Sequence, residues 1–303
     1  MQPGYLNISR EELTRRAEKA KERLKNCDIC PNNCGVDRTA GQVGICRAGY
    51  NPKVASHNLH QGEEPPISGT RGSGTIFFSF CTLKCAYCQN WPISQKGNGA
   101  ETDVTGLAGM MLELKKRGAH NINLVTPTHY MPQFLEALVL AVDEGFDLPI
   151  VYNTSGYEVV PALKLLDGIV DIYLPDMRYA CDLVAKRYSK AKMYSSYNRA
   201  AVKEMFRQVG NLQLDDDGIA VKGLIVRHLV LPGGISGTEE IFKFISEEVS
   251  RVVHISLMDQ YFPAYMADTV PELARKITED EFQMAMDIME KYGLQEGWVQ
   301  EHV

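Results

Sequence analysis

The chain has 303 residues, of which 45% are hydrophobic and 23% charged, and its formal net charge is −6 at pH 7. These proportions exclude disordered and fibrous proteins, and the length fits two domains or one α/β barrel. The acidic balance argues against a nucleic-acid partner, because phosphate binding goes with a basic surface. No stretch is apolar for long enough to span a bilayer, and the N-terminus lacks the apolar region of a signal peptide. We therefore expect a cytoplasmic protein without a membrane partner.

The first predicted element is an amphipathic helix from Arg10 to Leu24. Ser9 followed by Glu12 has the form of a capping box, and apolar residues then recur at helical spacing. This helix leads to a run rich in Gly, Pro, Asn and Asp, a composition that favours tight turns over regular structure.

Four cysteines lie in this run, at Cys27, Cys30, Cys34 and Cys46. In a reducing cytoplasm, grouped cysteines indicate a metal site rather than disulfides. Four thiolates are enough to close such a site. A structural zinc is our first interpretation, and an auxiliary iron-sulfur cluster, which needs the same ligands, is the alternative. We expect residues 1–55 to form a helix and metal-binding knuckle, and residues 56–303 to form a separate core.

From residue 75 onward, strand-like and helix-like segments alternate. Apolar, β-branched or aromatic runs predict strands at Thr75–Phe80, Ile122–Thr126, Ile150–Asn153, Ile169–Leu174, Leu224–Leu231 and Val252–Met258. Helical periodicity marks Leu107–Arg117, Pro132–Glu144, Val159–Leu166, Tyr197–Gln208, Glu239–Val249 and Glu279–Tyr292. The alternation implies parallel βαβ units with right-handed crossovers. The sequence therefore predicts an α/β fold, a partial (βα)6 barrel of the TIM-like kind.

The segment before the first of these strands is rich in Gly and Pro. It is typical of an extended approach that crosses under the barrel. His57, His60, Glu63 and Glu64 lie in it without any recognised ligand spacing, so the sequence favours a structural role for them over metal binding or acid–base catalysis.

The second cysteine group, Cys81, Cys85 and Cys88, follows directly on the first predicted strand of the barrel. Loops at the carboxyl ends of such strands are where α/β proteins place their active sites. Each of three thiolates can hold one iron of a cubane, which leaves a fourth iron open to an exogenous chelator. The alternative is a zinc site completed by His129 or Asp176, although structural zinc usually presents two CxxC-like pairs. The spacing favours the cluster.

The run CTLKCAYC around these cysteines resembles the CxxxCxxC signature of the radical S-adenosylmethionine (SAM) superfamily, including an aromatic residue, Tyr87, before the last cysteine. The resemblance implies that the three cysteines bind a [4Fe-4S] cluster, that SAM binds its open iron, and that Tyr87 lies near the adenine. It also implies reductive cleavage of SAM to a 5'-deoxyadenosyl radical, with an electron donor such as flavodoxin or ferredoxin. The protein then orients SAM and excludes water and oxygen.

Over most of the chain the resemblance is to homologues of pyruvate formate-lyase activating enzyme that carry an N-terminal cysteine cluster. VYNTSGYE resembles the segment that ends the third strand and contacts SAM, which places Asn153 and Ser155 there. YLPDMRY resembles the fourth-strand segment, so Asp176 and Arg178 inherit contacts with SAM, and IVRHLVLPG resembles the fifth, with Arg227 pointing inward. Taken singly, these residues also fit a strand-ending turn, a helix N-cap or a surface charge. Their joint placement at strand ends favours function.

Two departures from that family pattern suggest a different substrate. The glycine-rich motif that normally takes the SAM amino group is absent, and VTPTHY stands in its place, so the backbone carbonyls of Thr126 or Thr128 are candidates for that contact. Arg178 stands where Lys is usual, which keeps the charge but changes its reach. We expect His129 and His228 to be structural.

Three functions follow from this pattern. The first is radical SAM chemistry that installs a glycyl radical on a partner protein. The second applies the same chemistry to a peptide or a small molecule. The third is a non-catalytic metal-binding module that recognises a partner.

Overall fold

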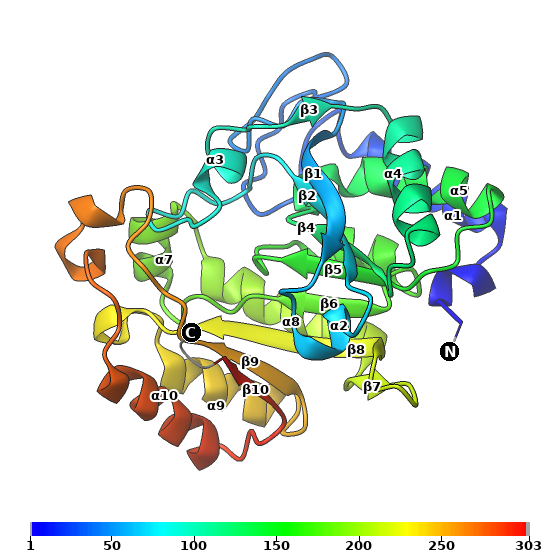
Figure 1. Cartoon of the computed structure of the whole chain (residues 1–303). Helices are drawn as coiled ribbons and strands as arrows, with labels where there is room; N and C mark the ends of the chain where they lie inside the picture. Colours follow the sequence, from blue (N-terminus) through cyan, green and yellow to red (C-terminus); the bar gives the residue numbers. More distant parts are fainter. Residues whose placement is uncertain (1, 301–303) are drawn as a thin grey trace.

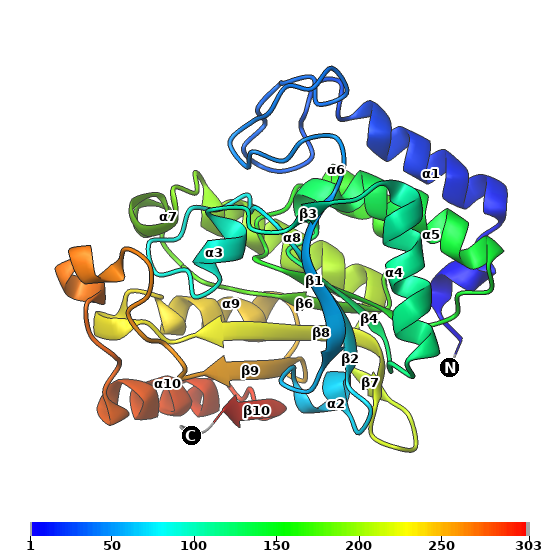
Figure 2. The same ribbon diagram turned by 45° about the horizontal axis from the view of Figure 1, so that its top comes forward.

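The computed structural model describes residues 2–300, and its centre is one mostly parallel sheet that curls into a partial barrel (Figures 1 and 2). The spatial order of strands is β10, β9, β8, β6, β5, β4, β2, β1, β3, and β7 pairs with β8. Their bounds are β1 Lys53–His60, β2 Ser73–Phe78, β3 Ala100–Glu101, β4 Ile122–Val125, β5 Ile150–Thr154, β6 Ile172–Pro175, β7 Gln213–Leu214, β8 Ala220–Leu229, β9 His254–Met258 and β10 Gly297–Gln300. From β2 to β10 along this order the pairing is parallel, while β1 is antiparallel to β2 and β3. The predicted fold class is confirmed.

The strands that the sequence predicts are all present, as β2, β4, β5, β6, β8 and β9. Every residue of β5 and β6 is buried, as strands covered on both faces require. Two predicted starts differ by more than two residues. The strand expected from Leu224 begins at Ala220. The strand expected from Ile169 begins at Ile172, because the N–H groups of Ile169 and Val170 both donate to the Leu166 carbonyl and close the preceding helical turn. The strands β1 and β10 were not predicted, since β1 is largely polar and β10 is short.

Helices cover the outside of the barrel in both views (Figures 1 and 2). The α-helices are α1 Arg10–Glu22, α2 Pro65–Ser68, α3 Trp91–Ser94, α4 Val104–Lys116, α5 Met131–Asp143, α6 Val160–Leu163, α7 Asp182–Ser189, α8 Tyr194–Val209, α9 Thr238–Glu248 and α10 Glu279–Lys291. Short 3-10 helices are η1 Gly4–Asn7, η2 Thr128–Tyr130, η3 Lys164–Leu166, η4 Pro232–Gly234, η5 Ala267–Thr269 and η6 Pro271–Leu273. The helix predicted over residues 159–166 is thus divided into α6 and η3, and α7 was not predicted. Within the described range, no helix is both long and apolar enough to cross a bilayer.

The N-terminal helix α1 packs against α5 on the outside of the barrel. Leu13 is buried there, and ion pairs of 2.7 Å join Arg10 to Asp143 and Lys21 to Glu136. The Ser9 side chain caps the helix by accepting the N–H of Glu12, as predicted. The Glu12 carboxylate pairs with two arginines of α1 itself, and this helix places the first cysteine group beside the barrel.

The helix α2 closes the end of the barrel at which the parallel strands begin. Ile67 is fully buried in a cluster with residues of β5, β6 and β8, among them Val151, Ile172 and Ile225. Val151 and Ile172 pair across the sheet near the starts of their strands. The chain therefore crosses under the barrel before it enters β2, as the Gly- and Pro-rich sequence indicates.

Candidate active site at the carboxyl ends of the strands

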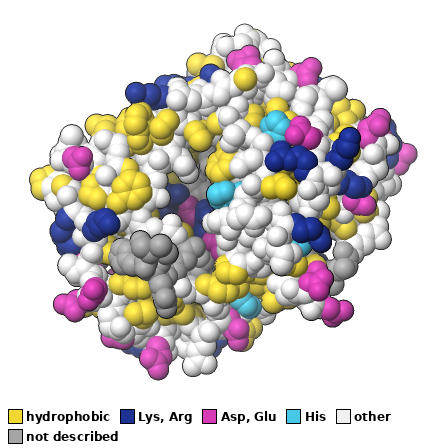
Figure 3. Space-filling view, viewed as in Figure 1, with side chains coloured by type: hydrophobic (Ala, Val, Ile, Leu, Met, Phe, Trp, Pro, Cys, Tyr) yellow, Lys and Arg dark blue, Asp and Glu magenta, His cyan; other side chains and the backbone are white. Residues whose placement is uncertain are grey.

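A cavity of about 370 Å³ opens where the parallel strands end. Figure 3 shows this face of the molecule hollowed near its middle, with acidic and basic side chains at the bottom of the hollow. Of the residues predicted for the site, those that line the cavity are Cys81, Cys85, Cys88, Thr126, Asn153, Ser155, Asp176, Arg178 and Arg227. The structure therefore brings together residues that are up to 146 positions apart, from Cys81 to Arg227.

Each sulfur of the second cysteine group has a hydrogen-bonding partner. The distances are 3.4 Å from Leu83 N to Cys81 Sγ, 3.0 Å from Ser189 Oγ to Cys85 Sγ, and 3.0 Å between Ser94 Oγ and Cys88 Sγ. Backbone N–H groups of this loop also donate to carbonyls at the end of α7, which fixes the loop to that helix. Ser189, on the unpredicted α7, is therefore a supporting residue that the sequence did not identify.

The donor set fits a cubane cluster better than a single zinc ion. Among residues 2–300, no three His, Cys, Asp or Glu side chains converge as ligands of one ion, and this holds for both cysteine groups. The two candidates for a fourth zinc ligand are engaged elsewhere, since His129 hydrogen-bonds a backbone carbonyl and Asp176 pairs with two arginines. Burial raises the pKa of the Cys81 thiol to about 12 and so favours the protonated form. A bound cation has the opposite effect, because it stabilises the thiolate. The cavity wall thus carries three thiols, which match the ligand requirement of a cluster with one open iron.

Asp176 is the centre of a buried charge network at the end of β6. Arg227 Nε donates to Asp176 Oδ1 at 2.8 Å, and Arg178 donates to the other oxygen. Arg227 also donates through Nη2 to Asn153 Oδ1 at 2.7 Å, and Arg178 Nη1 lies 3.8 Å from Cys85 Sγ. Burial opposes ionisation of Asp176, but Arg227 and Arg178 hold its pKa below the usual range. The alternatives of a helix N-cap for Asp176 and a surface charge for Arg227 are therefore wrong.

The hydroxyl of Ser155, just after the end of β5, has no hydrogen-bond partner among the described residues. Ser155 is 6% exposed, and its Oγ lines the cavity without a hydrogen-bond partner among the described residues. Its backbone is held from outside by α8, where Tyr194 Oη donates to the carbonyls of Ser155 (2.9 Å) and Asp176 (3.1 Å) and Asn198 Nδ2 donates to that of Gly156 (3.2 Å). A buried hydroxyl without a partner fits a site that receives a polar ligand.

The two threonines after β4 differ in placement. Thr126 lines the cavity and has a positive φ of 58°, a conformation that is rare for a β-branched residue and free of cost for glycine. This backbone matches the glycine that the family pattern places here, although the side chain differs. Thr128 Oγ1 instead donates to Glu158 Oε1 at 2.6 Å, and neither of these two residues lines the cavity.

Tyr87 lies beside the main cavity rather than in it. Its ring is 2% exposed, contacts Tyr179 and Tyr261 edge to face, and lines an adjoining pocket of about 200 Å³ together with Arg178 and Arg227. Because both pockets share these arginines, Tyr87 is placed where a ligand of the main cavity can extend.

The histidines near the site are structural, as expected. His129 Nε2 lies 2.8 Å from the Ser79 carbonyl, and burial lowers the pKa of its imidazole to about 3. His228 lies 2.8 Å from the Met177 carbonyl and 3.0 Å from Thr238 Oγ1, and burial lowers its pKa to about 4. Both imidazoles are neutral at physiological pH. Both ring nitrogens of His228 have partners, whereas His129 Nδ1 has none among the described residues.

Glu63 and Glu64 line the same cavity from the side of α2. The sequence favoured a structural role for them, because they precede the barrel strands and have no motif spacing. Their position depends on α2 crossing under the barrel, and only the folded chain reveals it.

The first cysteine group forms a compact set beside the barrel. Cys27, Cys30 and Cys46 are buried, and Cys34 is half-buried. Besides burial, the sulfurs of Cys27 and Cys46 raise the pKa of Cys30, so these sulfurs neighbour one another. The N–H groups two residues after Cys30 and Cys46 donate to the respective sulfurs, as the N–H of Leu83 does at Cys81. Such donors stabilise metal-bound thiolates.

The two cysteine groups are adjacent. The Lys84 ammonium is half-buried, burial lowers its pKa, and the sulfurs of Cys81 and Cys46, one from each group, raise it. Asn32 Nδ2 also donates to the Thr82 carbonyl at 2.8 Å, which ties the knuckle directly to the loop of the second group.

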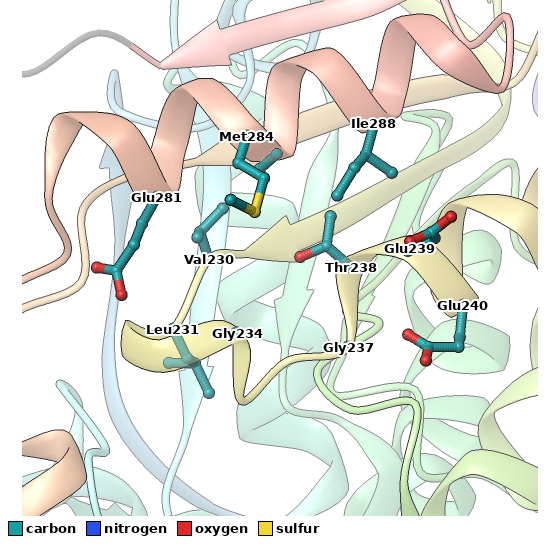
Figure 4. Close-up of a pocket in the computed structure, with 11 residues that line it drawn as sticks. Val230, Leu231, Gly234, Gly237, Thr238, Glu239, Glu240, Glu281, Met284 and Ile288 are labelled. Atoms are coloured by element: carbon teal, nitrogen blue, oxygen red, sulfur yellow. The ribbon is translucent and has the colours of Figure 1, made fainter.

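A further hollow of about 190 Å³ lies between η4, the start of α9 and α10 (Figure 4). Two of its three acidic residues have partners, since Glu281 caps α10 and pairs with Arg275 while Glu239 pairs with Lys291. Unlike the main cavity, this hollow has no lining side chain with a buried polar atom that lacks a partner among the described residues.

The architecture is that of the partial barrel of radical SAM enzymes. Streptococcus suis SuiB bound to precursor peptide SuiA matches 74% of this chain with a TM-score of 0.50 and 10% sequence identity. The FeFe-hydrogenase maturase HydG from Carboxydothermus hydrogenoformans matches 74% with a TM-score of 0.50 and 11% identity. The matches cover 47% and 52% of those proteins, so this chain spans about half of the length of each.

The chain belongs to the family of "Uncharacterized protein MJ0674" from Methanocaldococcus jannaschii. The two sequences are 32% identical over 291 residues, which is 93% of this chain and 79% of the other. No protein-family model matches the chain.

Proposed function

We propose that the protein is a radical SAM enzyme that holds a [4Fe-4S] cluster on Cys81, Cys85 and Cys88 and cleaves SAM reductively to a 5'-deoxyadenosyl radical. The cluster, when bound, supplies the one-electron chemistry. The observation that carries the proposal is the incomplete ligand set. Three thiols with hydrogen-bonding partners, buried at Cys85 and half-buried at Cys81 and Cys88, lie on the wall of a polar cavity at the strand ends.

The remaining residues of the cavity would bind and orient SAM. The unpartnered hydroxyl of Ser155 and the Asn153 amide offer hydrogen bonds to its polar groups, and the carbonyl of Thr126 is available to an ammonium. Arg178 lies between the cysteine loop and Asp176, where its charge favours the thiolate form of Cys85. The ring of Tyr87 extends the site toward an adenine.

The proposal is tested by anaerobic reconstitution with iron and sulfide, followed by addition of SAM and dithionite. We expect four irons lost in a Cys81, Cys85 and Cys88 triple-alanine variant, and release of 5'-deoxyadenosine by the wild type but not by Cys85→Ala. Cys181→Ala is the matched control, because Cys181 is exposed and outside the cavity. A cluster-loaded wild type that releases no 5'-deoxyadenosine would favour a non-catalytic metal-binding module instead.

The substrate of the radical distinguishes two versions of this function. The sequence resemblance to activating enzymes supports a glycyl radical on a partner protein. The acidic groups at the base of the cavity and the departures at Thr126 and Arg178 support a peptide or small-molecule substrate. A stable glycyl radical signal in the electron paramagnetic resonance spectrum of a co-purifying partner would decide for the first.

We propose a second metal on the four cysteines of residues 1–55, as a unit beside the catalytic core of residues 56–303. Three N–H···S contacts, at Cys30, at Cys46 and from Ile45 N to Cys34 Sγ at 3.4 Å, support it together with the shared Lys84. Zinc retained in the triple-alanine variant would assign a structural zinc, whereas about eight irons in the wild type would assign two cubanes. A second cluster next to Lys84 would also provide a route for electrons from a donor such as flavodoxin or ferredoxin.

A further inference from the structure

Glu63 and Glu64 form a rigid acidic floor in the main cavity. They precede α2, whose Ile67 is anchored in the barrel interior. The N–H groups of Ile67 and Ser68 donate to the Glu64 carbonyl at 2.8 and 3.1 Å, and Ser68 Oγ accepts the N–H of Glu63 at 3.0 Å. These hydrogen bonds fix the backbone from which the two carboxylates extend.

The Glu64 side chain lacks a partner for one carboxylate oxygen. Glu64 is 2% exposed, it lines the cavity, and its Oε2 is buried without a hydrogen bond to any described residue. A buried carboxylate oxygen in this state is costly. Since Glu64 lines the cavity and no described residue donates to this oxygen, a molecule that the cavity receives is the candidate for the missing donor.

The cationic groups of the cavity are committed elsewhere. Arg227 donates to Asp176 and Asn153, and Arg178 donates to Asp176. Asn153 Nδ2 reaches Glu63 Oε2 only at 3.4 Å. The lining has three carboxyl groups, those of Glu63, Glu64 and Asp176, against two guanidinium groups. Burial raises the pKa of Glu63 to about 7, and the charge of Arg227 opposes this shift.

We infer that the cavity binds a substrate with an alkylammonium group, which Glu63 and Glu64 receive at the floor. An ammonium is compact and has three donors, so it can reach both carboxylates and supply the bond that Glu64 Oε2 lacks. The inference rests on the proposed function for its chemistry, but the binding itself depends only on the fold. It narrows the substrate to amines, either free or as the side chain of a peptide.

The test measures binding of n-butylammonium to the anaerobically reconstituted full chain by isothermal titration, with n-butanol as the neutral isostere and n-butylguanidinium as a larger cation. We expect the ammonium to bind at least tenfold more tightly than the alcohol and the guanidinium. Glu64→Gln and Glu63→Gln should each lower ammonium affinity about tenfold. Glu247→Gln, the same change on the exposed face of α9, should leave it unchanged.

Two outcomes would overturn the inference. One is equal binding of the alcohol and the ammonium to the wild type. The other is a Glu64→Gln variant that loses affinity for SAM instead of for the ammonium, which would assign the floor to SAM. Ammonium binding by a protein that never releases 5'-deoxyadenosine would refute the proposed function and leave this inference standing.

Discussion

At the scale of single residues, the site combines groups that are satisfied by the protein with groups that are left free. Asp176 and its two arginines complete one another, whereas Ser155 Oγ and Glu64 Oε2 have no partner among the described residues. The first kind should determine stability when mutated, and the second kind should determine ligand binding.

Removal of the Ser155 hydroxyl should lower the affinity for SAM without lowering the stability of the fold. A hydrogen bond to a ligand is worth roughly 1–2 kcal/mol, so Ser155→Ala should lower SAM affinity about five- to thirtyfold. Equilibrium dialysis of the reconstituted protein measures this. Ser196→Ala, on the exposed face of α8, is the control, and equal affinities for both variants would exclude Ser155 from the SAM site.

Truncation of Arg227 should destabilise the whole protein. Arg227→Ala leaves the buried Asp176 with one cationic partner, and the loss of one member of a buried pair costs about 3–5 kcal/mol. Urea unfolding should show this loss, and Arg227→Lys should recover part of it. If the variant Arg227→Ala and the wild type have the same midpoint of urea unfolding, Asp176 is better solvated than its burial indicates.

At the scale of elements, the sequence predicted the alternating strands and helices of the barrel, but it did not predict the short connecting helices α2 and α7. The strands from β2 to β9 are apolar and bounded by turns, so their pattern was readable. The cysteine spacing likewise pointed to the loop whose three thiols line the cavity. In contrast, α7 has only eight residues and no side-chain cap at its start, and its Ser189 reaches Cys85 only through tertiary contact. Glu63 and Glu64 directly precede the short α2 and line the cavity. No hydrophobic periodicity in the sequence indicates that position.

The turn after β5 is fixed by a glycine that α8 covers. Gly156 has a φ of 70°, and a Cβ there would lie 2.1 Å from Asn198 Nδ2 and 2.6 Å from the Asp176 carbonyl. Gly156→Ala should therefore destabilise the protein by more than about 2 kcal/mol, through clash as well as backbone strain.

A variant at Gly218 separates the backbone strain from the steric clash. Its φ is 75°, but a Cβ would meet nothing within 4 Å, so Gly218→Ala should show only the backbone cost of about 1 kcal/mol. Thermal unfolding compares the two variants. Equal decreases in Tm would mean that α8 moves to accommodate the methyl group added at Gly156.

At the scale of the whole molecule, a buried carboxylate links stability to pH. Glu158 is 2% exposed, and burial raises its pKa from 4.5 to about 7 although the Thr128 and Thr154 hydroxyls oppose the shift. Between about pH 4.5 and 7 the unfolded chain has released this proton and the folded chain retains it. The contribution of Glu158 to stability is therefore full below that interval and is lost as pH rises through it.

Glu158→Gln should remove this part of the pH dependence. The difference in unfolding free energy between variant and wild type should move in favour of the variant by about 1–3 kcal/mol from pH 5 to pH 8. Urea unfolding at both pH values measures this difference. A difference that stays constant would show that Glu158 is already ionised at pH 5.

The position of α2 bears on the order in which the proposed ligands would bind. It closes the barrel where the strands begin, and Glu63 and Glu64 line the same cavity as the cysteine loop. If SAM binds at that loop and an amine at the two glutamates, we expect the amine to lie deeper, to bind first and to leave last. Saturation with SAM should then slow the escape of a preloaded amine, and the same SAM should exclude an amine that comes second.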